Sequence, residues 1–253
     1  MDILKTINIL YKKLKSERPL TYESVKRLSE DFMINYTFHS NAIEGSTLTL
    51  NETALVLKEG VTIAEKPLKH HLEAIGHKDA YYYIEELIKK KIPFTERVIK
   101  EIHSLVLMDR RIDKGVYRSV PVSVGEFTPC QPIEVPIKME QLLNEYNDMQ
   151  KLHVVEKVAL FHLKFETIHP FIDGNGRVGR LLLNFDLMKD GYPPINIKFS
   201  DRSKYYECFN HFRGNNGDPI KMTELVAGYV AEELIRYIDI SKQAQKIHDM
   251  QKD

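Results

Sequence analysis

Hydrophobic positions along most of the chain recur at spacings of three and four residues, the period of an amphipathic α-helix. In residues 31–45 four side chains share one helical face, at steps of four, three and four: Phe32, Tyr36, His39 and Ile43. Gly45 is a typical residue for ending this helix, and the capping box formed by Thr49 and Glu52 predicts that another begins and runs to Gly60. Further helices are predicted over residues 68–91, 95–108, 137–152, 156–168, 177–189, 203–212 and 223–246.

Strand-like alternation of apolar and polar positions is clear only in residues 115–127. Three valines alternate there with a proline and a serine: Val120, Pro121, Val122, Ser123 and Val124. Because Pro121 cannot donate to a ladder, we expect an edge or isolated β-hairpin, which we call the flap. With no internal repeat, low-complexity tract or flexible linker, the sequence predicts one all-α domain over residues 1–253 with a small β-hairpin.

Charge and cysteine content narrow the class of protein. Lys plus Arg and Asp plus Glu each number 36, so no global field draws the chain to nucleic acid or to an anionic membrane, and any phosphate binding must be local. The only cysteines are Cys130 and Cys208, the opening MDILKTINIL lacks the pattern of a signal peptide, and no apolar run approaches the roughly 18 residues of a membrane span. We therefore expect a cytoplasmic protein with neither nucleic acid nor a membrane as partner.

Residues 169–180, HPFIDGNGRVGR, concentrate polar groups and glycines at the start of a predicted helix. Pro170 disfavours helical backbone at His169, so the preceding helix should end there and present His169 at its tip. The two glycines of the following Asp-Gly-Asn-Gly turn permit positive φ and leave backbone N–H groups pointing into one concavity. A helix that begins at such a concavity provides an anion site.

The charged residues of this loop suit a particular kind of anion. Arg177 and Arg180, spaced i, i+3, would more naturally serve a polyphosphate than a single carboxylate. Asp173 is out of place beside an anion unless a cation mediates, and Mg²⁺ meets that need. His169 could take the proton of an attacking hydroxyl, so the set indicates a phosphoryl- or nucleotidyl-transfer site. The alternative is a capped loop whose arginines pair with surface acids.

The same residues match every fixed position of the Fic family signature, His-Pro-Phe, two residues, Gly-Asn-Gly-Arg, two residues, Arg. Downstream, LLLNFDLMKDGYPPINI and RSKYYE look like the family's continuing helix and its adenine pocket, and upstream GVYRSVPVSVG resembles its flap. The resemblance covers most of the chain. It implies an all-helical core that transfers AMP from ATP, with Mg²⁺, to a Tyr, Thr or Ser hydroxyl of a target protein, which could be the chain itself, releasing pyrophosphate.

The resemblance also implies roles for single residues. His169 is expected to be the catalytic base and Asp173 to bind Mg²⁺. Arg180 is expected to meet the γ-phosphate. Four consecutive residues are expected to hold the α- and β-phosphates: Gly174, Asn175, Gly176 and Arg177.

Two segments are expected to contact the rest of the substrates. Tyr205 and Tyr206 could stack on or hydrogen-bond around adenine, but adjacent helical residues point in different directions, so we expect only one to touch the base. Asn210 and Asn215 both remain candidates for a further contact to adenine. The flap edge could pair with an extended target segment or merely cover core surface, and its candidates are Val122, Ser123 and Val124.

Glu44 is predicted in the last turn of its helix, where a negative charge opposes the macrodipole at a cost of roughly 0.3–1 kcal/mol. The segment SNAIEG at residues 40–45 matches the family's inhibitory motif, Ser or Thr, three residues, Glu, then Gly or Asn, in the subclass that carries it N-terminal to the core. The resemblance implies that Glu44, in a motif that begins at Ser40, pairs with Arg180 and occupies the space of the γ-phosphate. The alternative is an ordinary solvated glutamate.

Other functions were weighed against AMP transfer. A kinase-like relative carries lysine where this chain has Gly176, which disfavours phosphate transfer. Removal of AMP from a modified target, with Glu44 positioning water, stays open. His162, Glu166 and His169 are spaced i, i+4, i+7 and would suit a metallohydrolase, but Pro170 breaks that helix.

Two helical regions could form interaction surfaces. The residues after Pro219 indicate one or two amphipathic helices rather than a winged-helix module. Another stripe, Tyr229, Ile235 and Ile238, suits either a homo-oligomer interface or core packing. The histidines at positions 70, 71 and 77 are expected on a partly exposed helix surface.

Overall fold

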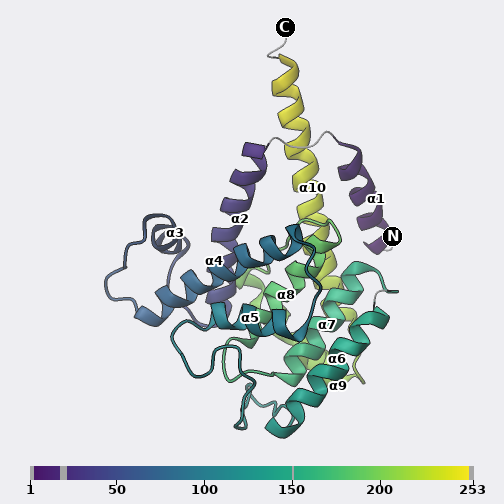
Figure 1. Cartoon of the computed structure of the whole chain (residues 1–253). Helices are drawn as coiled ribbons and strands as arrows, with labels where there is room; N and C mark the ends of the chain where they lie inside the picture. Colours follow the sequence, from purple (N-terminus) through teal and green to yellow (C-terminus); the bar gives the residue numbers. More distant parts are fainter. Residues whose placement is uncertain (1–2, 18–21, 150, 251–253) are drawn as a thin grey trace.

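A computed structural model describes residues 3–17, 22–149 and 151–250, and that part of the chain contains ten α-helices (Figure 1). They are α1 (Ile3–Ser16), α2 (Tyr22–Ile43), α3 (Leu50–Glu59), α4 (Leu68–Lys89), α5 (Glu96–Val106), α6 (Val135–Met149), α7 (Val154–Ile168), α8 (Asn175–Lys189), α9 (Arg202–Gly214) and α10 (Ile220–Met250). Two short 3₁₀ helices, η1 (Pro132–Glu134) and η2 (Phe199–Asp201), precede α6 and α9. The prediction of an all-α fold is confirmed.

The helix-end signals in the sequence have the expected geometry. The N–H of Glu52 donates to Thr49 Oγ1 at 3.2 Å and the N–H of Thr49 donates to Glu52 Oε2 at 2.8 Å, which completes the capping box of α3. At the end of α2, Gly45 has φ of 95°, and the N–H groups of Gly45 and Ser46 bond the carbonyls of Ala42 and Asn41. This double bond pattern is a Schellman motif, and it leaves Glu44 directly after the helix.

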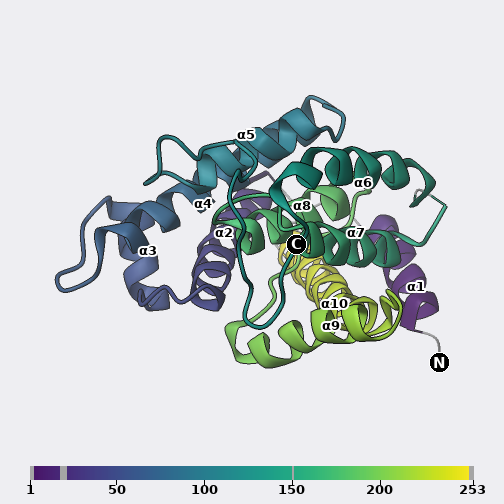
Figure 2. The same ribbon diagram turned by 90° about the horizontal axis from the view of Figure 1, so that it is seen from below.

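Helix α8 lies in the middle of the body in both Figure 1 and Figure 2, packed against α2, α4, α5 and α7. Its residues are buried almost throughout, and they join two apolar clusters. One cluster is formed mainly by α2 and α4–α8, and the other by α1 and α7–α10. The start of α8 is therefore held rigidly where the loop of residues 169–180 leads into it.

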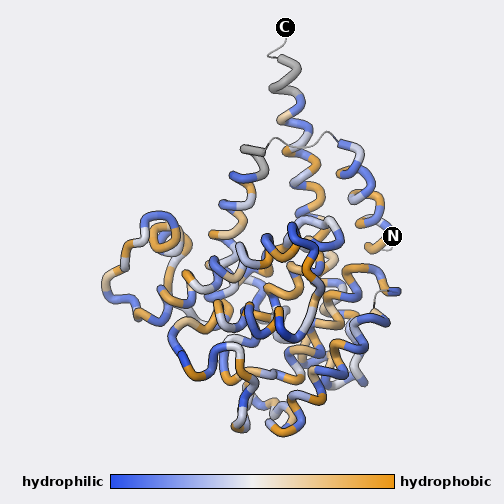
Figure 3. The backbone as a smooth tube through the Cα atoms, viewed as in Figure 1, coloured by the Kyte–Doolittle hydropathy of each residue, from blue (hydrophilic) through white to orange (hydrophobic). Residues whose placement is uncertain are grey.

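Outlying elements surround this body. Helix α3 packs on α2 and α4 at the left of Figure 1, and α10 packs on α1, α7 and α9 before its C-terminal end extends away. Apolar segments gather in the body in Figure 3. Of the predicted stripe on α10, Tyr229 and Ile238 are core residues, whereas Ile235 is 48% exposed. No helix in the described part of the chain is long and apolar enough to span a membrane.

The prediction of a β-hairpin in residues 115–127 is wrong, because the described residues form no strand there and a single isolated bridge joins Val124 to Phe127. The N–H of each donates to the carbonyl of the other, at 2.9 and 3.1 Å. In this register the next hydrogen-bonded pair would be Val122 with Pro129, and proline has no N–H to donate. The ladder therefore ends after one bridge.

The prediction of a partly exposed histidine surface is also wrong for two of its three residues. His71 is 3% exposed and accepts a hydrogen bond from the N–H of Ile63 at 2.9 Å. His77 is fully buried against Thr37 Oγ1, 3.0 Å from its Nδ1. Their helix, α4, is covered on both sides because α3 lies over one face and α2 and α8 lie over others.

Candidate active site

His169 stands at the end of α7, as the Pro170 rule predicts. It has left-handed backbone, with φ of 51° and ψ of 63°, and its N–H still bonds the carbonyl of Phe165 at 2.9 Å. Positive φ is costly for a residue with a Cβ, so the surroundings must hold it. Arg118 does so: its Nε donates to the carbonyl of His169 at 2.8 Å, and its backbone N–H donates to the carbonyl of Pro170 at 2.9 Å.

The loop that follows is fixed by its own side chains. Asn175 is buried, and its side chain bonds both the N–H and the carbonyl of Phe171, at 2.9 and 2.8 Å. Gly174 has φ of 79° and no side chain that caps α8. The N–H groups of the first turn of α8 therefore lack a capping partner, which leaves them available to an anion.

Two arginines leave the first turns of α8 in different directions. The guanidinium of Arg177 contacts Glu73 of α4 at 3.0 Å and Asp173 at 3.1 Å. Arg180 donates to Ser40 Oγ at 3.0 Å, to the Ser40 carbonyl at 2.8 Å and to Glu44 Oε1 at 2.8 Å. Both guanidiniums are buried, and the acids that fix their directions come from different segments, Glu73 from α4 and Glu44 from the residue after α2.

Asp173 has a carboxylate with one oxygen committed to the loop and one near solvent. Its Oδ1 accepts from the N–H of Gly174 at 2.6 Å and from Arg177, whereas Oδ2 contacts the exposed Lys69 at 3.4 Å. Burial raises the pKa of this carboxyl, but the charges of Arg177 and Lys69 outweigh that effect and hold its pKa below the usual range. An ionised carboxylate with one accessible oxygen fits Mg²⁺, which keeps several waters and needs one or two protein carboxylates.

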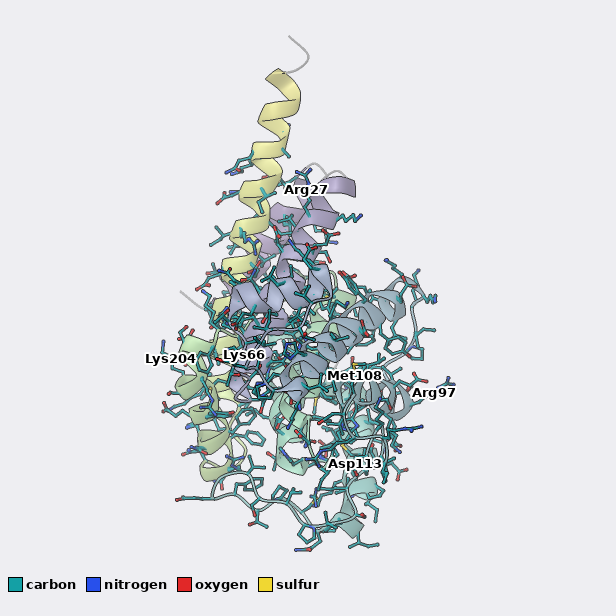
Figure 4. The ribbon with its side chains drawn as sticks, turned by 90° about the vertical axis from the view of Figure 1, so that its left-hand side faces the viewer. Arg27, Lys66, Arg97, Met108, Asp113 and Lys204 are labelled. Carbon is teal, nitrogen blue, oxygen red and sulfur yellow. The ribbon has the colours of Figure 1, made fainter. Side chains whose placement is uncertain are left out.

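A cavity of about 690 Å³ brings His169, Gly176 and Arg180 together with α9 and the flap. Its lining contains half of the expected site residues: Glu44, Val124, His169, Gly176, Arg180, Tyr205, Tyr206 and Asn210. Lys204 projects outward from α9 at the left of Figure 4, whereas the next residue, Tyr205, is 1% exposed. Both tyrosines line the cavity, and contact of only one of them with the base stays a prediction. Expected residues outside this lining are Ser40, Val122, Ser123, Asp173, Gly174, Asn175, Arg177 and Asn215.

Glu44 lies directly over the start of α8. A Cβ added to Gly176 would lie 2.2 Å from Glu44 Oε1, so only glycine permits this approach. Burial lowers the pKa of Arg180, but the neighbouring Tyr205 hydroxyl and Glu44 carboxylate raise it overall. The carboxylate thus occupies a position between an anion-binding helix terminus and a buried arginine.

In the stripe that was considered and disfavoured as a metal site, His162 contacts α9, whereas Glu166 and His169 contact each other. His162 Nε2 lies 2.7 Å from the Tyr205 hydroxyl, and Glu166 lies beside His169, with Oε2 3.4 Å from Nδ1. Among the residues that the structure describes, no three His, Cys, Asp or Glu side chains converge as ligands. The spacing of these side chains is thus used for contacts within α7 and with α9.

Sequence reasoning missed several residues that shape the site. Arg202 and Arg213 line the cavity and lie over the rings of Tyr206 and Phe127, at 5.0 and 4.3 Å. Glu73, which orients Arg177, carries no local signal because its helix is distant in sequence. Arg118 could have been suspected, since it lies inside the flap segment.

These features define an all-helical protein with an uncapped helix N-terminus, a buried arginine and a histidine around one cavity. The model of the Fic/DOC family matches residues 93–187. A Fic domain containing signaling protein from Bacteroides thetaiotaomicron has the same fold, with a TM-score of 0.83 and 35% identity, covering 95% of this chain and 97% of that one. The chain belongs to the Fic family.

Curated relatives are longer than this chain. It is 36% identical over 222 residues to "Protein adenylyltransferase Fic" of Nematostella vectensis, covering 85% of this chain and 51% of the relative. It is 33% identical over 224 residues to "Protein adenylyltransferase fic-1" of Caenorhabditis elegans, covering 87% of this chain and 44% of the relative. The chain therefore spans about half the length of these curated relatives.

Proposed function

We propose that this chain transfers AMP from ATP to a Tyr, Thr or Ser hydroxyl of a protein target and releases pyrophosphate. The names of its relatives support this activity. The observation that carries it is the single cavity in which His169 lies beside Gly176 and Arg180. A hydroxyl held there would meet a base on one side and an anion-binding helix terminus on the other.

The residues of the loop have separate roles in nucleotide binding and proton transfer. His169 accepts the proton of the attacking hydroxyl. The N–H groups around Gly174–Arg177 receive the α- and β-phosphates at the positive end of α8, and Arg180 receives the γ-phosphate. Asp173 would hold Mg²⁺, whose charge offsets that of the phosphates when it is bound.

The base of the nucleotide is assigned to α9. Tyr205, Tyr206 and Phe209 line this end of the cavity. Tyr205 and Phe209 are 1% and 6% exposed, so the partly exposed Tyr206 is the ring that can offer a flat face to adenine. Asn210 also lines the cavity, whereas the side chain of Asn215 bonds the carbonyl of His211 at 2.9 Å. These placements favour Asn210 over Asn215 as the further contact.

The target is assigned to the flap. Val122 and Ser123 precede the single bridge, which Val124 forms with Phe127, and they have no partner strand among the described residues, so their backbone groups can pair with an extended segment. Exposure alternates along Val122, Ser123 and Val124, as it does along a strand edge. The chain itself is one candidate target.

Glu44 is proposed to restrain this activity. Its carboxylate lies 2.8 Å from Arg180 and against Gly176, where the γ-phosphate would be received, and Ser40 holds the same guanidinium from α2. ATP could still bind through the remaining groups, with its α-phosphate misaligned for attack. Because Glu44 also lines the cavity beside His169, removal of AMP by a water that Glu44 positions is the second candidate function.

Mass spectrometry of the Glu44→Gly variant, incubated with Mg-ATP and a host lysate, tests the reaction. Addition of AMP to protein is expected, and its mass is far larger than that of a phosphate. Addition of phosphate would replace the proposal with phosphoryl transfer. If neither modification formed and the variant bound no ATP by calorimetry, the assignment would be wrong.

A further inference from the structure

Glu166 is a mostly buried acid in the wall of the cavity that the proposed reaction leaves without a role. It lies in the last turn of α7, where a negative charge opposes the helix macrodipole. Its side chain is 11% exposed, and its Oε1 has no hydrogen-bond partner among the described residues. A carboxylate in such a place is costly, so its contacts need an explanation.

The carboxylate of Glu166 contacts the ring of His169. Glu166 Oε2 lies 3.4 Å from His169 Nδ1, which is ion-pair contact but longer than an aligned hydrogen bond. Burial raises the pKa of Glu166, but the neighbouring His169, His162 and Arg180 outweigh that effect and lower it. The acid is therefore ionised, and it faces Nδ1 of the His169 ring.

Gly179 of α8 leaves room for the side chains of Glu166 and His162. A Cβ at Gly179 of α8 would lie 2.8 Å from Glu166 Oε1 and 2.7 Å from His162 Cε1, so glycine allows α8 to approach. His162 is held by the Tyr205 hydroxyl and not by Glu166. Glu166 thus remains directed at His169.

We propose that Glu166 is a positioning residue for His169: its carboxylate holds the ring with Nδ1 protonated, which leaves Nε2 free to accept the proton of the attacking hydroxyl. The two ring nitrogens are distinct, and the partner of one decides which is protonated. This inference rests on the proposed AMP transfer, because it assigns the tautomer that the transfer needs. Catalytic contacts that are long without substrate commonly tighten when it binds.

AMP transfer to the hydroxyl needs no further reactant. The hydroxyl oxygen forms a bond to the α-phosphorus, the bond from that phosphorus to the bridging oxygen breaks, and its electron pair leaves on pyrophosphate. The hydroxyl proton passes to His169 Nε2. The resulting imidazolium carries its charge next to the Glu166 carboxylate until the proton is released to water.

Two variants test the role in the Glu44→Gly background. Glu166→Leu removes the carboxylate, and Glu166→Gln keeps an oxygen that can accept from Nδ1–H without the charge. We expect kcat to fall at least tenfold in Glu166→Leu and less in Glu166→Gln, with KM for ATP unchanged within about twofold, since orientation of a general base contributes on this scale. Glu145→Gln removes an acid from the neighbouring α6, 50% exposed, and should retain the parent kcat.

A spectroscopic measurement separates this role from a structural one. The chain has ten histidines, and the ¹⁵N signals of His169 can be assigned by their loss in His169→Ala. The protein with Glu166 should show Nδ1 protonated and Nε2 bare, and Glu166→Leu should shift that tautomer toward Nε2–H. An unchanged tautomer, or an unchanged kcat, would overturn the inference. If the Glu44→Gly parent transferred no AMP, the proposed function would fail, and the tautomer alone would decide the contact of Glu166.

Discussion

Replacing Glu44 by glycine should raise AMP transfer, including transfer to the chain itself, at least tenfold. The substitution removes the 2.8 Å hydrogen bond to Arg180 and the carboxylate that lies against Gly176. Arg180 keeps its bonds to Ser40 and Tyr205, so it should stay oriented toward the cavity. What changes is the charge that an incoming phosphate must displace.

The size of the effect follows from the exposure of the pair. A hydrogen bond between charged groups contributes about 1.5–3 kcal/mol, and the lower end applies because the Glu44 side chain is 32% exposed. Since about 1.4 kcal/mol corresponds to a factor of ten, releasing Arg180 should favour the productive triphosphate by about tenfold. Repulsion between Glu44 and phosphate, which the variant also removes, would add to this factor.

Transfer of label from α-labelled ATP to protein measures the change, with Glu59→Gly as the matched control. Glu59 is also a glutamate at a helix end before a glycine with positive φ, but it is exposed at the end of α3. Glu44→Gln, which keeps the shape and loses the charge, should give an intermediate rate. Equal labelling of the wild-type chain and of Glu44→Gly would refute this reasoning.

Three other outcomes follow from the site and its support. His169→Ala, made in the Glu44→Gly chain, should abolish labelling, while calorimetry shows an ATP affinity within about twofold of that of Glu44→Gly. Retained labelling would show that His169 is not the catalytic base. Gly179→Ala should lower the free energy of unfolding, measured by urea titration, by about 1–3 kcal/mol, since its Cβ would lie 2.7 Å from His162. Gly228→Ala is the control, because Gly228 in α10 has open space around it; this variant should be neutral or stabilising by up to ~1 kcal/mol. Burial lowers the pKa of His162 from 6.5 to about 4, so unfolding takes up a proton between these values. The free energy of unfolding should therefore fall by roughly 3 kcal/mol as pH drops from 6.5 to about 4, and by less in His162→Gln. If the free energies of unfolding of the wild type and His162→Gln fell in parallel with pH, His162 would not be a buried neutral imidazole.

Local rules predicted the helices and the core of the site. The capping box of α3, the Gly45 end of α2 and the Pro170 end of α7 each depend on residues close in sequence, and each has the expected geometry. The 3.6-residue period located the helices because most have one buried face. Most predicted helix ends differ by up to four residues, as for α10, which runs over Ile220–Met250 rather than 223–246. Two differences are larger: α2 begins at Tyr22 rather than near residue 31, and α1 (Ile3–Ser16) was not predicted.

Features that depend on the partner of a residue could not be obtained in this way. Pro121 suggested an edge strand, but Pro129, on the opposite side of the turn, is what ends the ladder, and its effect follows from register. The spacing of Arg177 and Arg180 predicted adjacent guanidiniums, yet Glu73 and the α2 terminus direct them apart. Histidine burial on α4 likewise depends on which helices cover it.

The two arginine contacts differ in a way that bears on how the site could be released. Arg177 and Glu73 are 2% and 9% exposed, so separating them would leave two buried charges with only the more exposed Asp173 and Lys69 as partners, at a cost of up to about 3–5 kcal/mol. Glu44 is 32% exposed and follows a helix end, so its carboxylate can turn into solvent while Ser40 and Tyr205 still hold Arg180. An anion entering the loop would therefore compete with Glu44 and leave the Glu73 contact intact. This asymmetry explains why we assign the restraint to Glu44 and a fixed structural contact to Glu73, although both acids bind arginines of the same helix.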